Sequence, residues 1–138
     1  VRAFGLQDNT ENVIITHGRM ASVALEAFAM LEEEGIKTAV FLCEFIKPYD
    51  MLADLVAEIM PAHVRNIVFL EEEILAGGCG MNLSTELKKQ RIAPRASHKI
   101  IAVDDNFAIP QKGETVWQAT GVDSRSVYEA VLAMNGLS

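Results

Sequence analysis

The residues best suited to chemistry stand in four short polar segments, each of which directly follows a stretch of apolar and β-branched residues. The segments comprise residues 16–19, 43–44, 71–73 and 104–105. The apolar stretches predict strands of a parallel sheet, and ligands of open parallel sheets gather beyond the carboxyl ends of the strands. We therefore expect these four segments to meet at one edge of a sheet.

Three consecutive glutamates, residues 71–73, form one of these segments. Paired carboxylates can carry out acid–base chemistry when burial separates their pKa values. A run of three acids is more typical of a solvated strand end or turn, and we favour this structural interpretation. In this interpretation, one of the glutamates caps backbone donors of the glycine turn that follows, or forms a salt bridge with Arg19.

Three glycines, Gly77, Gly78 and Gly80, lead into a segment of helical period. Glycines at the start of a helix let backbone N–H groups approach an anion, and the helix dipole favours negative charge there. The Lys-Ser/Thr pair of a P-loop and the spacing of a dinucleotide fingerprint are both missing, and the acids upstream repel a phosphate. We favour a tight turn with close helix packing, and keep a regulatory small-anion site as the alternative.

Histidine and cysteine complete the candidate chemistry. His17 could titrate near neutral pH, but it has no Ser or Cys neighbour arranged as a triad, and His63 and His98 share no metal-ligand spacing with it. Cys43 and Cys79 belong to no CxxC motif and no His/Cys cluster in the sequence, and we interpret both as small apolar fillers. The residues alone therefore predict no catalytic constellation, no metal site and a reducing, cytoplasmic setting.

The elements that position these residues alternate between strand and helix character. Strands are predicted near residues 13–16, 38–43, 66–70 and 99–103, with a weaker edge strand in residues 1–6. Helical spacing covers residues 20–31, which Gly35 ends, residues 50–59, which Asp50 caps, the segment after Gly80, and residues 127–132. This alternation predicts an α/β fold: a three-layer α/β/α sandwich around a mostly parallel sheet of about five strands.

Length and composition limit the class of protein. The chain has 138 residues, half of them hydrophobic, which suits a single domain spanning residues 1–138 with a packed core. A net charge of -7 makes nucleic acid an unsuitable partner, and no apolar run reaches the roughly 18 residues of a membrane helix. Because the sequence begins with Val1, we expect it to be a piece of a longer chain.

Several motifs occur in the order of a known family. They are NVIITHGRM at residues 12–20, FIKPYD at 45–50, IVFLEE at 67–72, LAGGCG at 75–80, DNF at 105–107, PQKG at 110–113 and TGVD at 120–123. Their order resembles the C-terminal domain of the transketolase group of thiamine-diphosphate enzymes. The last three are most similar to the end of the 1-deoxy-D-xylulose 5-phosphate synthase branch. Related domains occur in transketolase and in the β subunit of 2-oxoacid dehydrogenases.

The resemblance implies an assembly role rather than a catalytic one. In this group, thiamine diphosphate and Mg²⁺ bind between two other domains, and their binding motif is absent from this sequence. The implied partners are other domains of the same chain and a second copy in a homodimer. The resemblance thus marks seven positions as candidate interface or anion-turn residues: His17, Arg19, Glu71, Glu72, Gly77, Gly78 and Gly80.

The resemblance also implies the reaction of the parent enzyme. In the synthase branch, pyruvate is decarboxylated on thiamine diphosphate and its two-carbon unit is transferred to glyceraldehyde 3-phosphate. The isolated domain would be inactive. Two alternatives stay open: a partner-docking module like that of a dehydrogenase β subunit, and the regulatory anion site at the glycine turn.

Overall fold

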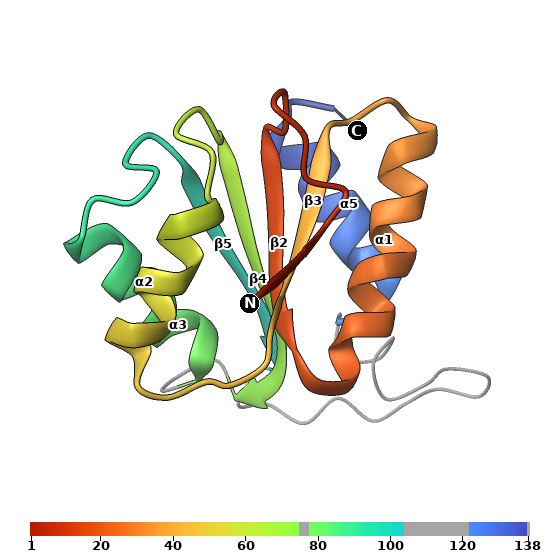
Figure 1. Ribbon diagram of the computed structural model, residues 1–138. Coiled ribbons are helices and arrows are strands. Elements are labelled where there is room, and N and C mark those ends of the chain that lie inside the picture. Colours follow the sequence, from red (N-terminus) through yellow and green to blue (C-terminus); the bar gives the residue numbers. More distant parts are fainter. Residues whose placement is uncertain (75–77, 104–121, 138) are drawn as a thin grey trace.

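The computed structural model describes residues 1–74, 78–103 and 122–137. A five-stranded sheet with the order β1-β3-β2-β4-β5 forms its centre (Figure 1). The strands are β1 (Arg2–Phe4), β2 (Asn12–His17), β3 (Thr38–Cys43), β4 (Asn66–Ile74) and β5 (Ser97–Val103). A 3-10 turn, η1 (Gly18–Met20), precedes the helices α1 (Ala21–Glu33), α2 (Tyr49–Ile59), α3 (Cys79–Lys89) and α5 (Ser124–Met134).

The sheet is mostly parallel, as the sequence predicts. Strands β3, β2, β4 and β5 run parallel to one another, while β1 pairs antiparallel with β3 at the edge. Each parallel connection passes through a helix, because parallel neighbours need a long crossover. Strand β4 continues beyond the predicted residues 66–70 to Ile74, with an irregularity in its pairing to β5 after Leu70.

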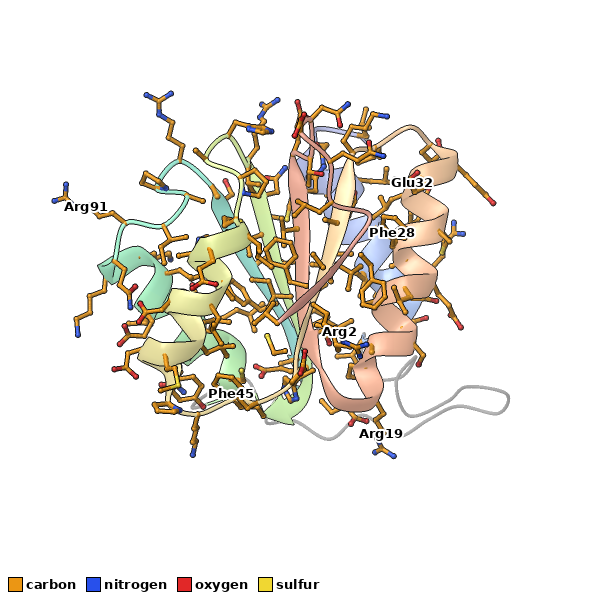
Figure 2. The ribbon with its side chains drawn as sticks, viewed as in Figure 1. Arg2, Arg19, Phe28, Glu32, Phe45 and Arg91 are labelled. Atoms are coloured by element: carbon orange, nitrogen blue, oxygen red, sulfur yellow. The ribbon has the colours of Figure 1, made fainter. Side chains whose placement is uncertain are left out.

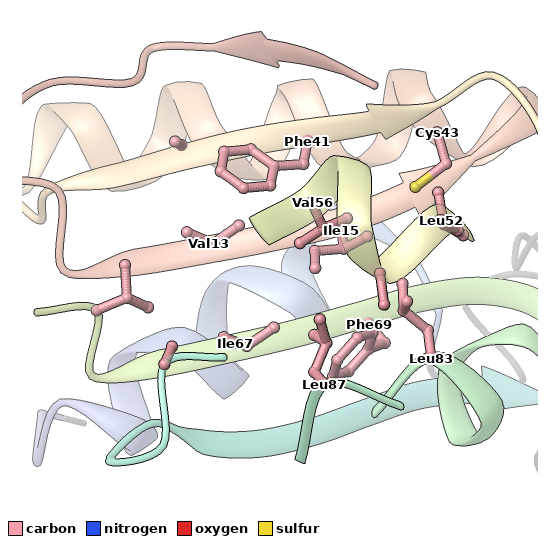
Figure 3. Packing of buried hydrophobic residues seen from close by; sticks show 14 residues of the cluster. Val13, Ile15, Phe41, Cys43, Leu52, Val56, Ile67, Phe69, Leu83 and Leu87 are labelled. Carbon is pink, nitrogen blue, oxygen red and sulfur yellow. The ribbon is translucent and has the colours of Figure 1, made fainter. Parts of the chain in front are cut away.

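Helices cover both faces of the sheet and complete the three layers. Helices α2 and α3 lie on one face, and α1 and α5 lie on the other (Figure 1). Because side chains alternate along a strand, Phe41 and Phe69 pack under α2 and α3 (Figure 3), whereas Val40 and Val68 pack under α1 and α5. The predicted α/β/α sandwich is therefore confirmed. Among the described residues, no helix is long and apolar enough to cross a membrane.

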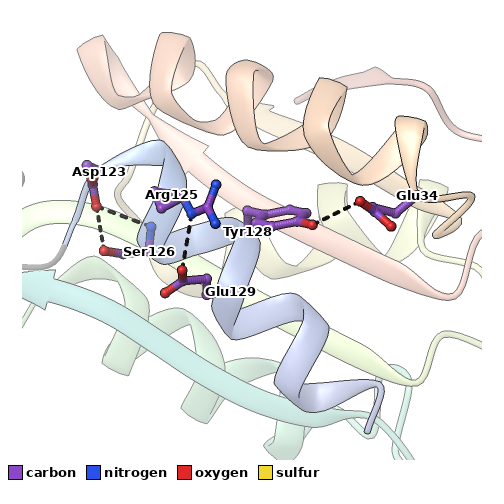
Figure 4. Close-up of polar contacts among 6 residues, drawn as sticks. All are labelled: Glu34, Asp123, Arg125, Ser126, Tyr128 and Glu129. Atoms are coloured by element: carbon purple, nitrogen blue, oxygen red, sulfur yellow. Dashed lines mark hydrogen bonds and ion pairs between the residues drawn. The ribbon is translucent and has the colours of Figure 1, made fainter. Parts of the chain in front are cut away.

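Two helix starts show how local sequence sets the boundaries. Helix α2 begins at Tyr49 after Pro48, so Asp50 lies in the first turn and is not the N-cap that the sequence predicts. Its acidic charge still favours the positive end of the helix dipole. Helix α5 does have a side-chain cap, because Asp123 accepts hydrogen bonds from the backbone and hydroxyl of Ser126 (Figure 4).

Helices α1 and α5 pack in the same apolar cluster and share one hydrogen bond at their surface. The Tyr128 hydroxyl on α5 donates a hydrogen bond of 3.2 Å to Glu34 at the end of α1 (Figure 4). Gly35, with φ +73°, then turns the chain toward β3, a conformation that suits glycine. The predicted glycine stop of this helix is thus confirmed.

Candidate functional site

The polar segments that follow β2, β3 and β4 meet at the carboxyl edge of the sheet, as predicted. His17 ends β2 and lies in register with Cys43, which ends β3. Glu71 lies on the neighbouring strand β4, and Cys79 begins α3. All four residues line one small cavity at this edge. The fourth predicted segment, residues 104–105, lies outside the described residues.

Glu71 and Glu72 point to opposite faces of the sheet, because β4 stays extended through both of them. Glu71 continues the row of Ile67 and Phe69, which faces α3, and the residue is 1% exposed. Its Oε2 accepts a hydrogen bond of 2.9 Å from the backbone N–H of Gly80. The expectation of a solvated strand end is therefore wrong for Glu71, whereas the predicted capping of the glycine turn is confirmed.

Gly80 packs too closely against β4 and β5 for a side chain to fit without displacement. A Cβ atom at this position would lie 3.0 Å from Glu71 Oε1, 3.0 Å from Phe69 Cβ and 3.1 Å from Ile100 Cγ2. Such separations are shorter than ordinary van der Waals contact. The favoured interpretation of the glycines, close helix packing, is thus confirmed at Gly80. Gly78 precedes α3 as its N-cap, and Gly77 lies outside the described residues.

Glu72 pairs with Arg19 on the α1 side of the sheet, which confirms the second predicted role of the glutamates. The Nε atom of Arg19 lies 3.0 Å and 2.9 Å from the two carboxylate oxygens of Glu72. The hydrogen bond to Glu72 raises the pKa of Arg19 above its ordinary value. Most of the Arg19 side chain is exposed, and Figure 2 shows it pointing outward at the carboxyl edge. An ion pair this exposed contributes little to stability.

Three potential metal ligands come together in the buried part of this edge. The imidazole of His17, the carboxylate of Glu71 and the thiol of Cys79 each offer one atom, and these atoms lie within 4.8 Å of one another. The sequence predicts neither a His/Cys cluster nor a metal site, and spacing along the chain gave no signal. The three residues belong to three separate elements, so only the folded sheet shows that they are neighbours.

The other histidines and cysteines lie in surroundings that suit packing rather than chemistry. The Nδ1 of His98 lies 2.7 Å from the hydroxyl of Ser84, and burial together with the nearby Lys88 lowers the pKa of His98 to about 4. Burial raises the pKa of the Cys43 thiol to about 11. Cys43 and Cys79 are both buried and form no disulfide, which confirms their predicted packing positions. His63 is exposed at the far end of β4.

The carboxyl edge does not fit a magnesium diphosphate. Mg²⁺ prefers oxygen ligands, and the His17–Glu71–Cys79 group offers a single carboxylate among its three side chains. The backbone N–H of Gly80, which a phosphate could use, already donates to Glu71. These residues therefore do not suit the metal and diphosphate of thiamine enzymes, and the anion-binding role of the glycine turn stays a prediction.

The fold and the order of its motifs define the class of this protein. Residues 3–127 match the family model described as "Transketolase, C-terminal domain". The chain belongs to this family, which confirms the resemblance seen in its motifs.

The comparisons also show which family members are similar. The chain is 32% identical over 126 residues to a 1-deoxy-D-xylulose-5-phosphate synthase of Chlorobium phaeovibrioides, with 91% of this chain and 19% of that protein covered. It is 26% identical over 131 residues to a 1-deoxy-D-xylulose-5-phosphate synthase of Dehalococcoides mccartyi, with 95% of this chain and 20% of that protein covered. The chain thus spans about a fifth of the length of these curated relatives.

A solved structure gives the same class. The chain is similar to a protein described as "Split gene transketolase, inactive beta4 tetramer", with a TM-score of 0.73 and 28% sequence identity. The similarity covers 99% of this chain and 42% of that one. The sheet and helix layers described above are therefore shared with a transketolase.

Proposed function

We propose that this chain is the C-terminal assembly domain of a thiamine-diphosphate-dependent transferase of the 1-deoxy-D-xylulose 5-phosphate synthase type. The complete enzyme would convert pyruvate and glyceraldehyde 3-phosphate to 1-deoxy-D-xylulose 5-phosphate and CO2, a reaction of isoprenoid precursor synthesis. The observation that carries the proposal is the match to synthases across 91% of the chain, combined with the family match over residues 3–127.

In this proposal, other domains of the enzyme bind thiamine diphosphate and Mg²⁺. The cofactor supplies the carbanion chemistry that joins the two substrates. The donor set of His17, Glu71 and Cys79 supports this division of labour, because it is poor in the oxygen ligands that Mg²⁺ prefers. The domain would contribute packing surface and no reacting group.

The proposed packing surface is the carboxyl edge of the sheet. Arg19 and Glu72 place an exposed ion pair there, and polar pairs of this kind are typical of the rims of protein interfaces. His17 ends β2 at the same edge. We expect this edge to face the other domains of the same chain and a second copy in a homodimer. We expect the enzyme to work in the cytoplasm.

The experiment is to purify the complete native assembly that contains this chain and to assay its cofactor and its reaction. We expect bound thiamine diphosphate, with one CO2 released for each 1-deoxy-D-xylulose 5-phosphate formed from pyruvate and glyceraldehyde 3-phosphate. An assembly that holds no thiamine diphosphate would contradict the proposed class of enzyme.

Transketolase is the second candidate, because the similar solved structure is described as a split-gene transketolase. The same purified assembly separates the two activities. A transketolase transfers a two-carbon unit from a ketose donor and releases no CO2, whereas the synthase consumes pyruvate and releases CO2. Thiamine-dependent transfer from a ketose without release of CO2 would favour transketolase and exclude the synthase.

A further inference from the structure

We propose that His17, Glu71 and Cys79 form a binding site for a divalent transition metal of the zinc type at the carboxyl edge of the sheet. Among the described residues, they are the only group of three or more His, Cys, Asp or Glu side chains whose ligand atoms cluster in this way. Two of the three, Glu71 and Cys79, are buried, and His17 is partly buried. The site is independent of the thiamine cofactor and of the proposed function.

The distances are close to those of a metal centre. Zinc binds nitrogen and oxygen at about 2.0–2.2 Å and sulfur at about 2.3 Å, so tetrahedral ligands lie about 3.3–3.8 Å apart. The three ligand atoms already lie within 4.8 Å of one another. A contraction of about 1–1.5 Å, by movement of the His17 and Cys79 side chains toward the held Glu71 carboxylate, would bring them to the geometry of a bound ion. Strands β2 and β4 and helix α3 position the three residues at this edge.

The cavity between these residues has the size of a single ion. Its volume of about 10 Å³ is about the room that one water molecule needs. Most of the remaining wall is apolar and includes Ile15 and Leu83. A bare ion fits this space, whereas a phosphate or an organic cofactor is too large for it.

The donor types and their charges favour zinc over magnesium or calcium. Imidazole, thiolate and one carboxylate suit Zn²⁺, whereas Mg²⁺ and Ca²⁺ take oxygen ligands. A carboxylate on Glu71 and a thiolate on Cys79 would together balance the two charges of the ion, so little net charge would be buried. The hydrogen bond from Gly80 N–H to Glu71 Oε2 orients the carboxylate, as outer partners of metal ligands commonly do.

Cys43 provides a matched control within the same cavity. It lines the cavity and lies in register with His17, but its sulfur does not belong to the group of clustered ligand atoms. The described residues therefore supply three protein ligands to the proposed site. Removing either cysteine deletes one buried thiol from the cavity wall, yet only Cys79 supplies a ligand.

The test uses the 138-residue chain, stripped with a chelator and then titrated with Co²⁺ or Zn²⁺ alone. We expect one bound ion per chain, a thiolate-to-cobalt charge-transfer band in the near ultraviolet, and a higher melting temperature with Zn²⁺. Cys79→Ala should lose the band and Cys43→Ala should keep it. His17→Gln should weaken the affinity for Zn²⁺ by at least about tenfold.

Three outcomes would overturn the proposal. The first is the absence of a charge-transfer band in the unmodified chain, and the second is a band that persists in Cys79→Ala but disappears in Cys43→Ala. If circular dichroism shows that Cys79→Ala is unfolded, His17→Gln decides, because His17 is only partly buried at a strand end. Unchanged zinc affinity in a folded His17→Gln variant is the third outcome that overturns the site.

Discussion

Gly80→Ala tests whether close packing at the start of α3 defines the carboxyl edge. The added Cβ would lie 3.0 Å from Phe69 Cβ, 3.0 Å from Glu71 Oε1 and 3.1 Å from Ile100 Cγ2. The Phe69 atom is fixed to strand β4, Ile100 is β-branched and stiff, and the Glu71 carboxylate is held by its hydrogen bond to Gly80 N–H. The neighbours therefore cannot move aside without shifting the helix or the strand.

The expected cost follows from two opposing effects. Overpacking of this kind costs about 1–3 kcal/mol, and replacing glycine by alanine in a helix returns at most about 1 kcal/mol. Gly80 is only the second residue of α3, so this return is smaller than in a helix interior. We expect a net loss of roughly 1–2 kcal/mol in the free energy of unfolding, which lowers the melting temperature of a domain of this size by roughly 3–10 °C.

Urea denaturation and thermal melting, followed by circular dichroism, measure this loss. Met81→Ala is the matched control, because Met81 is the next residue of α3 and its side chain is exposed, so its loss should change stability little. A Gly80→Ala variant as stable as the unmodified chain, or more stable, would refute the packing described for this edge.

The remaining predictions concern His98, the α5 cap and the exposed ion pair. Burial and the nearby Lys88 lower the pKa of half-buried His98 from 6.5 to about 4. As the pH falls from 6.5 to about 4, His98 therefore gains a proton in the unfolded chain but not in the folded one. Stability should therefore drop by roughly 1–2 kcal/mol between these pH values, after allowance for solvent screening, and His98→Gln should flatten the urea-midpoint profile. A profile that is identical in both proteins would contradict this. Asp123→Ala removes the cap of α5 and should lower the free energy of unfolding, measured by urea denaturation, by about 0.5–2 kcal/mol. Asp123→Asn should retain most of this stability, because asparagine also caps helices. Equal losses in the two variants would contradict capping. A double-mutant cycle of Arg19→Gln and Glu72→Gln should give a small coupling that fades with added salt, and a large, salt-independent coupling would argue against an exposed pair.

The sequence predicts the layers of this fold well because each element is locally consistent. Apolar runs such as residues 38–43 have the continuous hydrophobicity of strands covered on both faces, and the observed β3 has the same bounds. Gly35 acts as an end signal whose physical role does not depend on distant residues. Local chemistry alone decides these features.

The candidate site depends on features that local patterns do not show. Glu71 and Glu72 are adjacent and chemically identical, yet one is buried under α3 and the other pairs with Arg19 at the surface. The difference arises because strand β4 continues through both glutamates, so their side chains point to opposite faces of the sheet. Three consecutive charged residues gave no signal that a strand would continue there. The approach of His17 to Cys79 likewise depends on the order of strands in the sheet.

Isothermal titration of the 138-residue chain with thiamine diphosphate and Mg²⁺ tests most directly whether the cofactor site lies in other domains. We predict no saturable heat up to high micromolar cofactor, because the carboxyl edge offers neither an oxygen-rich metal site nor a free N–H at Gly80. Saturable binding of thiamine diphosphate with micromolar affinity would contradict an assembly domain without a cofactor site of its own.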